Sequence, residues 1–346
     1  MLPCPTLISV TEFSLMRPFL PALLLLLISV SVHAAEPAYH VTRREVLPGD
    51  VRWDYLSYDA RNKRLFLTRG DHVEVYDTTL GHVIGEIPET PGVHGVALAP
   101  DLDKGFTSNG RSNTVTIFEL SSLRVLGTLP TERNPDAIAY DPFTRRVFAA
   151  NGKSGNLTVI DAVNDKVLAT VSIGGKLEFE AVDGKGHLYV NIEDLNALAV
   201  VDTAALSVLA RHDLSASCRE PAGLSIDAAG ERLFVGCRNQ VMAVVSGVTG
   251  QILAVVPIGK GSDATAYDRD LHLAFSSNGD GTLTVISTDS YTVLQTLVTQ
   301  PNARTLALDA VGHHIYTVAA ERDEPGTSST RPHLKPGTFT LITVSR

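Results

Sequence analysis

Residues 135–172 read PDAIAYDPFTRRVFAANGKSGNLTVIDAVNDKVLATVS, in which four short β-rich runs are separated by polar turns. The runs are rich in the β-branched and aromatic residues that suit a pleated, half-buried surface. No helical period of apolar residues separates them. The stretch therefore predicts four consecutive strands, which is the composition of one blade of a β-propeller.

The same pattern occurs seven times along the chain. Each unit has a first strand that ends at or near Asp, and these ends lie 41 to 44 residues apart, at Asp59, Pro100, Asp141, Asp183, Asp227, Asp268 and Asp309. Each second strand begins with an aromatic residue: Phe66, Phe106, Phe148, Tyr189, Phe234, Phe275 and Tyr316. This period is typical of propeller blades rather than of helical or leucine-rich repeats. The sequence predicts an all-β, seven-bladed propeller with four-stranded antiparallel blades.

The last unit is one strand short. Residues 338–344 (TFTLITV) supply its third strand, and little chain follows. An open stack of blades would leave apolar faces and sheet edges exposed, so the ring must close. We expect residues 39–47 (YHVTRREVL) to supply the missing outer strand of the last blade. Residues 36–346 would then form a single propeller domain.

The N-terminus has the order of a secretory signal. Arg17 precedes an apolar run at residues 19–32, and small residues follow it. We predict that residues 1–35 are a cleaved signal peptide, with Met16 as its start. The run is too short to span a bilayer comfortably and no comparable run follows, so the mature protein is expected to be soluble and periplasmic or secreted.

The unit resembles the YncE-like, YVTN-type β-propellers of bacteria, with the pattern P-x-x-I-A, L-Y-V-x-N, V-x-V-I-D and V-x-x-T-I. The third unit matches closely, with PDAIA at 135–139, VFAANG at 147–152 and LTVID at 157–161. The fourth departs from it, with NIED at 191–194 where Asn-Gly is usual. The resemblance covers essentially the whole mature chain and implies the propeller fold. It implies little about function, because members of this family are mostly not assigned a reaction.

Ligands of closed β architectures favour the mouth of the channel. In a propeller, the loops that enter first strands and leave second strands share that face. The residues five positions before the ends of the first strands are Asp54, Gly95, Asp136, Glu178, Ala222, Asp263 and Arg304, and His94, Glu180 and Glu220 lie nearby. We interpret this set as a ring around the channel entrance.

Two interpretations of the ring remain open. In the first, it forms a polar, mostly anionic cup for a small polar ligand or a divalent metal, since oxygen-rich sites suit hard cations. In the second, the side chains hydrogen-bond loop amides and cap strand ends. His94 occupies the position held by Pro135 and Pro221 in other units, which favours a structural role for it.

A second set of polar residues lies at the ends of the second strands: Arg69, Asn109, Asn151, Asn191, Cys237 and Asn278. Asn109, Asn151 and Asn278 each precede Gly, which is itself a tight-turn signal. We therefore interpret these Asn residues as turn residues rather than ligand contacts.

Cys218 and Cys237 are the two cysteines of the predicted mature chain. Both should lie on the mouth face of the fifth blade, at the ends of neighbouring antiparallel strands, and an exported chain meets an oxidising environment. We predict a disulfide between them, with two free thiols as the alternative. No His occupies an equivalent position in that blade, which speaks against a catalytic thiol.

The loop at residues 320–337 is several times longer than its counterparts. Loops of this length are commonly functional or disordered. One interpretation makes it a lid over the mouth, with Arg331, His333 and Lys335 facing the acids, and the other makes it a surface excursion.

The leading functional prediction is a non-enzymatic, monomeric binding or scaffold propeller that presents its mouth to a small polar ligand, a metal ion or a periplasmic protein. The alternative is a metal-dependent enzyme, such as a lyase or lactonase-like hydrolase. Single-stranded nucleic-acid binding is a third and remote hypothesis, suggested by Trp53, Arg69 and Arg111. The net charge of −9 and the lack of basic runs weigh against it.

Overall fold

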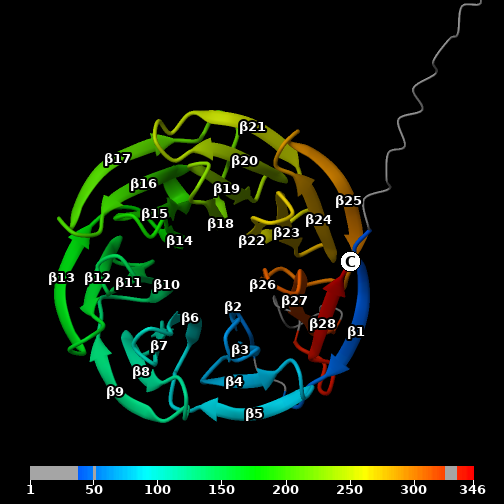
Figure 1. Ribbon diagram of the computed structural model, residues 1–346, viewed down its shortest axis with the longest axis horizontal. Helices are drawn as coiled ribbons and strands as arrows, with labels where there is room; N and C mark the ends of the chain where they lie inside the picture. The colour runs from blue at the N-terminus through cyan, green and yellow to red at the C-terminus, as the bar shows by residue number, and fades with distance from the viewer. Residues whose placement is uncertain (1–37, 50–51, 324–332) are drawn as a thin grey trace, which may run out of the picture. The chain divides into compact units, whose positions relative to one another are not determined.

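The computed structural model describes residues 38–49, 52–323 and 333–346, and the predicted signal peptide at residues 1–35 lies outside this range. Seven four-stranded antiparallel sheets are arranged as blades in a closed ring (Figure 1). The predicted seven-bladed propeller is therefore confirmed.

The first four blades follow one another along the chain. Blade one consists of β2 (Leu56–Asp59), β3 (Arg64–Arg69), β4 (His72–Asp77) and β5 (His82–Ile87). Blade two consists of β6 (Val93–Ala99), β7 (Lys104–Asn109), β8 (Thr114–Glu119) and β9 (Val125–Pro130). Blade three consists of β10 (Pro135–Asp141), β11 (Arg146–Asn151), β12 (Asn156–Asp161) and β13 (Lys166–Ser172). Blade four consists of β14 (Leu177–Val182), β15 (His187–Ile192), β16 (Ala197–Asp202) and β17 (Ser207–Asp213), with the short helix η1 (Glu193–Leu195).

The remaining blades complete the ring. Blade five consists of β18 (Pro221–Asp227), β19 (Arg232–Cys237), β20 (Val241–Ser246) and β21 (Ile252–Pro257). Blade six consists of β22 (Ser262–Asp268), β23 (Leu273–Asn278), β24 (Thr282–Ser287) and β25 (Thr292–Val298). Blade seven consists of β26 (Leu306–Asp309), β27 (His314–Ala319), β28 (Thr340–Ser345) and the N-terminal strand β1 (His40–Val46).

Ring closure follows the prediction. Strand β1 pairs antiparallel with β28, from His40 opposite Ser345 to Val46 opposite Thr340. Just before β1, Tyr39 is 2% exposed and packs edge-on against Phe275 of blade six, with ring centroids 5.3 Å apart. The N-terminal segment thus both completes blade seven and seals it against its neighbour.

The core lies between the blades. The aromatic residues at the second strands are buried, and the Phe members among them, such as Phe106 and Phe148, are fully so. Third strands are buried along most of their length, as in β12, whereas the outer strand β17 alternates between exposed and half-buried residues. Both faces of the middle strands therefore pack against neighbouring sheets, which explains their continuous apolar runs.

The recurring Asp at the end of the first strand has a local cause. Asp59 Oδ1 accepts hydrogen bonds from the amides of Arg61 and Asn62, and Asp268 and Asp141 receive similar bonds from the turns that follow them. Such a carboxylate satisfies turn amides that no strand partner reaches. The Asp of the repeat is thus a turn residue.

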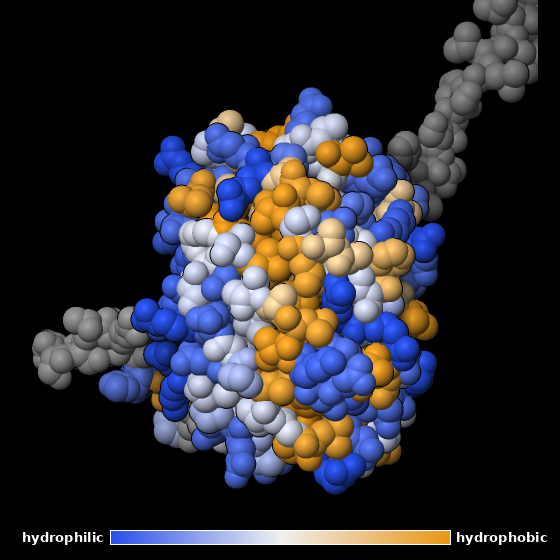
Figure 2. Space-filling model, turned by 90° about the vertical axis from the view of Figure 1, so that its left-hand side faces the viewer, coloured by the Kyte–Doolittle hydropathy of each residue, from blue (hydrophilic) through white to orange (hydrophobic). Residues whose placement is uncertain are grey.

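The outer surface carries apolar side chains in a band on the side where β13 lies (Figure 2). The outer strands β9, β13 and β17 expose Val125, Leu126, Val167, Leu168 and Leu209. Individual apolar residues at a surface are normal, because polar area cannot cover a whole protein. In the described part of the chain, no helix is long and apolar enough to cross a membrane.

Candidate functional site

A cavity of about 1130 Å³ opens on one face of the ring. Its walls come from the loops that enter first strands and the loops that leave second strands, in blades seven, one, two and three. This is the face that the sequence predicts as the channel mouth. Asp54, His94 and Arg304 of the predicted ring line it directly.

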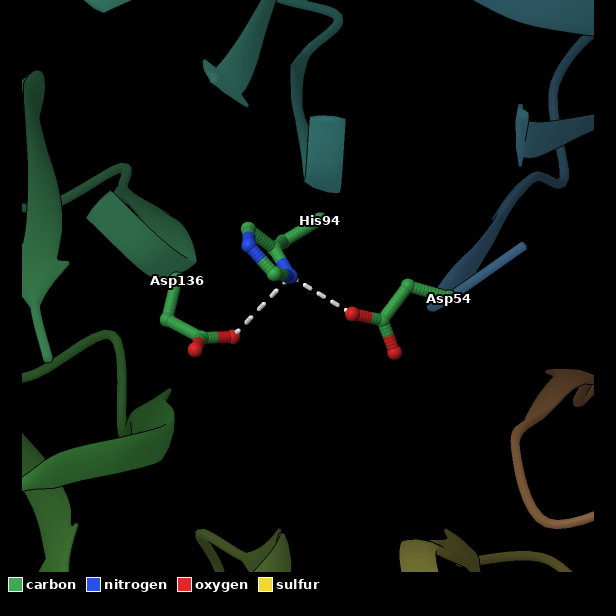
Figure 3. Close-up of side chains that lie close together, drawn as sticks. All are labelled: Asp54, His94 and Asp136. Carbon is green, nitrogen blue, oxygen red and sulfur yellow. Dashed lines mark hydrogen bonds and ion pairs between the residues drawn. The ribbon is translucent and has the colours of Figure 1, made fainter. Parts of the chain in front are cut away.

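Three side chains from consecutive blades converge at this mouth (Figure 3). His94 Nδ1 lies 2.6 Å from Asp54 Oδ2 and 3.6 Å from Asp136 Oδ1. The three side chains are 13 to 27% exposed, so solvent reaches them only partly. We refer to Asp54, His94 and Asp136 as the Asp–His–Asp cluster.

Gly110 explains why the His94 ring lies as it does. A Cβ atom at residue 110 would come within 2.6 Å of His94 Nε2 and 2.7 Å of its Cδ2. Only glycine therefore leaves room for the ring in this orientation. With its Nε2 edge packed against Gly110, the imidazole directs Nδ1 at the two carboxylates.

The surroundings of the cluster shift the pKa values of His94 and Asp136. Burial alone would lower the pKa of His94, but the hydrogen bond to Asp54 and the charges of Asp136 and Asp54 outweigh it and raise this pKa to about 9. Burial raises the pKa of Asp136 to about 6, against the opposing effect of His94. At neutral pH, His94 is thus an imidazolium held between carboxylates.

The other ring acids lie beside cations. Asp263 Oδ2 lies 2.6 Å from Arg304 Nε, and its Oδ1 lies 3.2 Å from Arg238 Nη2. Glu178 lies 3.4 Å from Lys176 and 3.7 Å from Arg238. The expectation of a mostly anionic cup is therefore not met at these two acids.

The sequence patterns did not predict Lys176, Arg238 or their partner Glu193 at this site. One signal for Arg238 was present, since it directly follows Cys237, at the position where Gly follows Asn in blades two, three and six. Glu178 is still repelled by neighbouring carboxylates despite these cations. Burial, and then the charges of Asp136 and Glu193, raise the pKa of Glu178 to about 9.

Two aromatic residues lie next to these acids in the sequence. Tyr55 and Phe179 immediately follow Asp54 and Glu178, and their rings meet edge-to-face at 4.9 Å and 85°. Burial, and then the charges of Asp136 and Glu178, raise the pKa of Tyr55 well above its usual range. The phenol therefore stays neutral.

Glu180 and Glu220 do not join the ring. Glu180 is 4% exposed, and neither carboxyl oxygen has a hydrogen-bond partner of good geometry among the described residues. Burial raises its pKa well above the usual range, against a smaller opposing effect of the Ala139 amide. Glu220 is exposed and its backbone amide donates to Asn196 Oδ1.

We expect Glu180 to make folding pH-dependent. Its pKa is raised in the folded state, so its proton favours folding at low pH, and this contribution is lost as pH rises above the unfolded value of about 4.3. The variant Glu180→Gln should lose less stability than the parent between pH 5 and pH 8, by up to about 1.4 kcal/mol for each pH unit. Urea denaturation at both pH values measures this. Exposed Glu220→Gln is the matched control, and equal pH slopes in parent and Glu180→Gln would contradict the expectation.

The polar residues at the ends of the second strands have structural partners. Asn151 Nδ2 donates to Asn156 Oδ1 and Thr158 Oγ1 across the β11–β12 turn, and Asn109 and Asn278 make equivalent bonds to threonines. Asn191 Nδ2 instead donates to the carbonyl oxygen of Ala222. The bonds of Asn109, Asn151 and Asn278 fit the interpretation of these residues as turn residues.

Arg69 does not reach the mouth. It is fully buried, lies 2.7 Å from Glu74 and stacks 3.7 Å from the ring centre of Phe339. Trp53 is 9% exposed and packs against the same Phe339 ring. Of the three residues that suggested nucleic-acid binding, Arg111 is the exposed one at the cavity.

The predicted disulfide is confirmed. Cys218 and Cys237 are bonded, with Cα atoms 5.3 Å apart, and both are fully buried. The bond links the loop before β18 to the end of β19. Since Arg238 follows Cys237 directly, the disulfide also anchors the backbone that carries Arg238 to Glu178 and Asp263.

The long loop of blade seven borders the cavity at its two described ends, through Arg322 and Leu334. Lys335 lies 3.1 Å from Glu321 rather than beside a ring acid, and the carbonyl of His333 accepts the Asp323 amide. Arg331 lies outside the described residues.

Comparison with known proteins shows the fold. Neither a protein-family profile nor a curated protein sequence matches the chain. Among solved structures, it is similar to U3-55K, a seven-bladed propeller of the WD40 type, with a TM-score of 0.72 and 12% identity. The match covers 86% of this chain and 98% of that one. At this identity, the likeness establishes a seven-bladed β-propeller and carries nothing about ligand or activity.

Proposed function

We propose that this protein is an exported, YncE-like binding propeller that takes a small polar ligand in its mouth cavity. The observation that carries the proposal is the convergence of Asp54, His94 and Asp136, of which Asp54 and His94 line a cavity of about 1130 Å³. A concave site with a few convergent polar groups is where a propeller would hold a small molecule. The repeat pattern supports the family assignment, and the disulfide supports export.

Binding accounts for the cluster better than a purely structural role. Its hydrogen bond joins side chains of different blades, at a point where solvent still reaches the atoms. Asp54 Oδ1 has Arg304 Nη2 only at 3.9 Å, so it keeps accepting capacity for a ligand donor. A ligand hydroxyl or amine fits this position.

The ligand proposal predicts that binding depends on His94. A panel of amino acids, sugars, carboxylic acids and nucleotides would be screened by thermal shift and calorimetry. We expect compounds that bind the parent to bind His94→Gln at least 10-fold more weakly, because the imidazolium no longer orients Asp54. His272→Gln is the matched control, since His272 is exposed and pairs with Asp289. Binding that both variants retain equally would place the ligand elsewhere.

A metal-dependent enzyme is the second candidate. Asp54, His94 and Asp136 can each offer one ligand atom, and these atoms lie within 4.8 Å of one another. Carboxylates with imidazole suit Mn²⁺ and Zn²⁺, and the adjoining cavity would leave coordination positions for a substrate.

The metal candidate predicts calorimetric binding of Mn²⁺ that falls at least 10-fold in Asp136→Asn and is unchanged in Asp71→Asn, since Asp71 lines the cavity outside the cluster. Metal analysis of the purified protein and the thermal shift on chelation complete the test. Equal Mn²⁺ binding by the parent and Asp136→Asn would exclude this site.

A further inference from the structure

The lining of the mouth cavity is positively charged, although the protein as a whole is acidic. The chain carries a net charge of −9. The cavity lining nevertheless contains six Arg and Lys side chains, besides His94, against the two carboxylates of Asp54 and Asp71. The six are Arg52, Arg111, Arg133, Lys153, Arg304 and Arg322. A positive cavity in an acidic protein concentrates anions at that one place.

Most of these cations lack a carboxylate partner. Within residues 38–49, 52–323 and 333–346, Arg304 is paired with Asp263. In the same part of the chain, no carboxylate lies within 4.0 Å of the charged nitrogens of Arg52, Arg111, Arg133, Lys153 or Arg322. This contrasts with the acids of the ring, which lie beside Lys176, Arg238 and Arg304. The cations of the cavity are therefore available to a ligand.

The cations also act on one another. Burial, and then the charges of Arg304 and Arg52, lower the pKa of Arg322. These three side chains come from the β27–β28 loop, the β25–β26 loop and the segment before β2. Like charges held together by separate loops cost free energy in the absence of an anion, and an anion bound among them relieves that cost.

The cavity lining places hydrogen-bond acceptors among the cations. Arg111 lies after β7, Arg133 before β10 and Lys153 after β11, so cations line the cavity from blades two and three as well as from blades seven and one. Asp54 lies 2.6 Å from His94 and 3.9 Å from Arg304, and its carboxylate oxygens can accept hydrogen bonds. A ligand that contacts both the cations and Asp54 carries negative charge on one part and hydrogen-bond donors on another.

We infer that the mouth cavity binds a small, multiply charged oxyanion, a phosphate or a carboxylate, whose charge lies among Arg52, Arg111, Arg133, Lys153 and Arg322. This rests on the proposed binding function and names its ligand class. Guanidinium groups suit such oxyanions because their fork of donors matches two oxygens at once. Hydroxyl or amine groups on the same ligand would face Asp54.

The test uses pyrophosphate and citrate as probes, titrated into the full mature protein by calorimetry at constant ionic strength. We expect at least one probe to bind, and its dissociation constant to rise at least 10-fold in Arg111→Gln/Arg133→Gln. The matched control is Arg61→Gln/Arg124→Gln, which removes the same charge at exposed sites outside the cavity. Preference for pyrophosphate or for citrate distinguishes phosphate from carboxylate ligands.

Two results would overturn the inference. One is the absence of binding by both probes, and the other is an equal loss in the cavity and control variants. If neutral sugars or amines bind in a manner that depends on His94 while both probes fail, the binding function stands and the oxyanion class falls. Since the four substituted arginines are exposed, unfolding temperatures within about 2 °C of the parent would show that folding is intact.

Discussion

Deleting residues 38–47 should remove most of the stability of the propeller. The deletion removes β1, with six paired positions along β28, and the buried Tyr39. At about 0.5–1.5 kcal/mol for each net hydrogen bond and about 1.5–3 kcal/mol for the aromatic side chain, the loss is on the order of 5 kcal/mol or more. That is comparable with the whole stability of many domains. Urea denaturation, followed by the fluorescence of the single tryptophan, Trp53, measures it.

The same deletion allows a rescue experiment. A synthetic peptide of residues 38–47 should add back as an edge strand and restore the unfolding midpoint, since β28 would otherwise present an open edge. The matched control peptide carries Tyr39→Ala, which keeps the backbone bonds but loses the packing against Phe275, and should restore less. A deleted protein with the parental midpoint would show that β1 does not close the ring.

Replacing both cysteines, in Cys218→Ala/Cys237→Ala, should destabilise the protein by about 3 kcal/mol. The bond joins residues 19 positions apart, and a loop of this size accounts for about 3 kcal/mol through the entropy of the unfolded chain. Both sulfurs are fully buried, so cavities left by the shorter side chains add to the loss. Urea denaturation under oxidising conditions measures the difference.

Treatment with a reductant distinguishes the contribution of the disulfide to stability from the contribution of side-chain packing. The parent should lose stability in dithiothreitol, whereas the double variant should not change, because it has no bond to break. A parent that is unaffected by full reduction, verified by thiol labelling after unfolding, would show that the bond contributes little. Binding by the reduced protein would also reveal whether Arg238 needs the bond to stay beside Glu178 and Asp263.

The fold was predictable because each unit repeats the same local physics. The terminal Asp of the first strand satisfies turn amides, and the aromatic of the second strand fills the space between blades, as Asp59 and Phe106 illustrate. Both roles recur at the same position of every unit, so they leave a periodic pattern in the sequence. Ring closure followed from counting strands, because the only β-rich run left unassigned was the one at residues 39–47.

The candidate site was predictable only in part. Counting back from the strand ends brought Asp54, Asp136 and Glu178 to the correct face, because the first strands repeat the same geometry, including the register shift that β10 and β14 share. Of the cavity cations, Arg111 and Arg304 were named from the sequence, whereas Arg52, Arg133, Lys153 and Arg322 were missed. Arg111 and Lys153 share an offset, two residues after the ends of β7 and β11, but the positions counted from the repeat stopped at the strand ends. Glu180 was grouped with the ring because it is close to Glu178 in the sequence, but its side chain is buried.

The pairing of β1 with β28 also determines when the last blade can form during synthesis. The first strand of the propeller leaves the ribosome about 300 residues before its partner, so it must wait without a neighbour while six blades assemble. The sequence of β1 suits a strand that stays unpaired for this time. Arg43, Arg44 and Glu45 place charges along an otherwise β-forming segment, and charged edges discourage pairing with the wrong strand. The polar character of this strand thus protects an unfinished chain from aggregation.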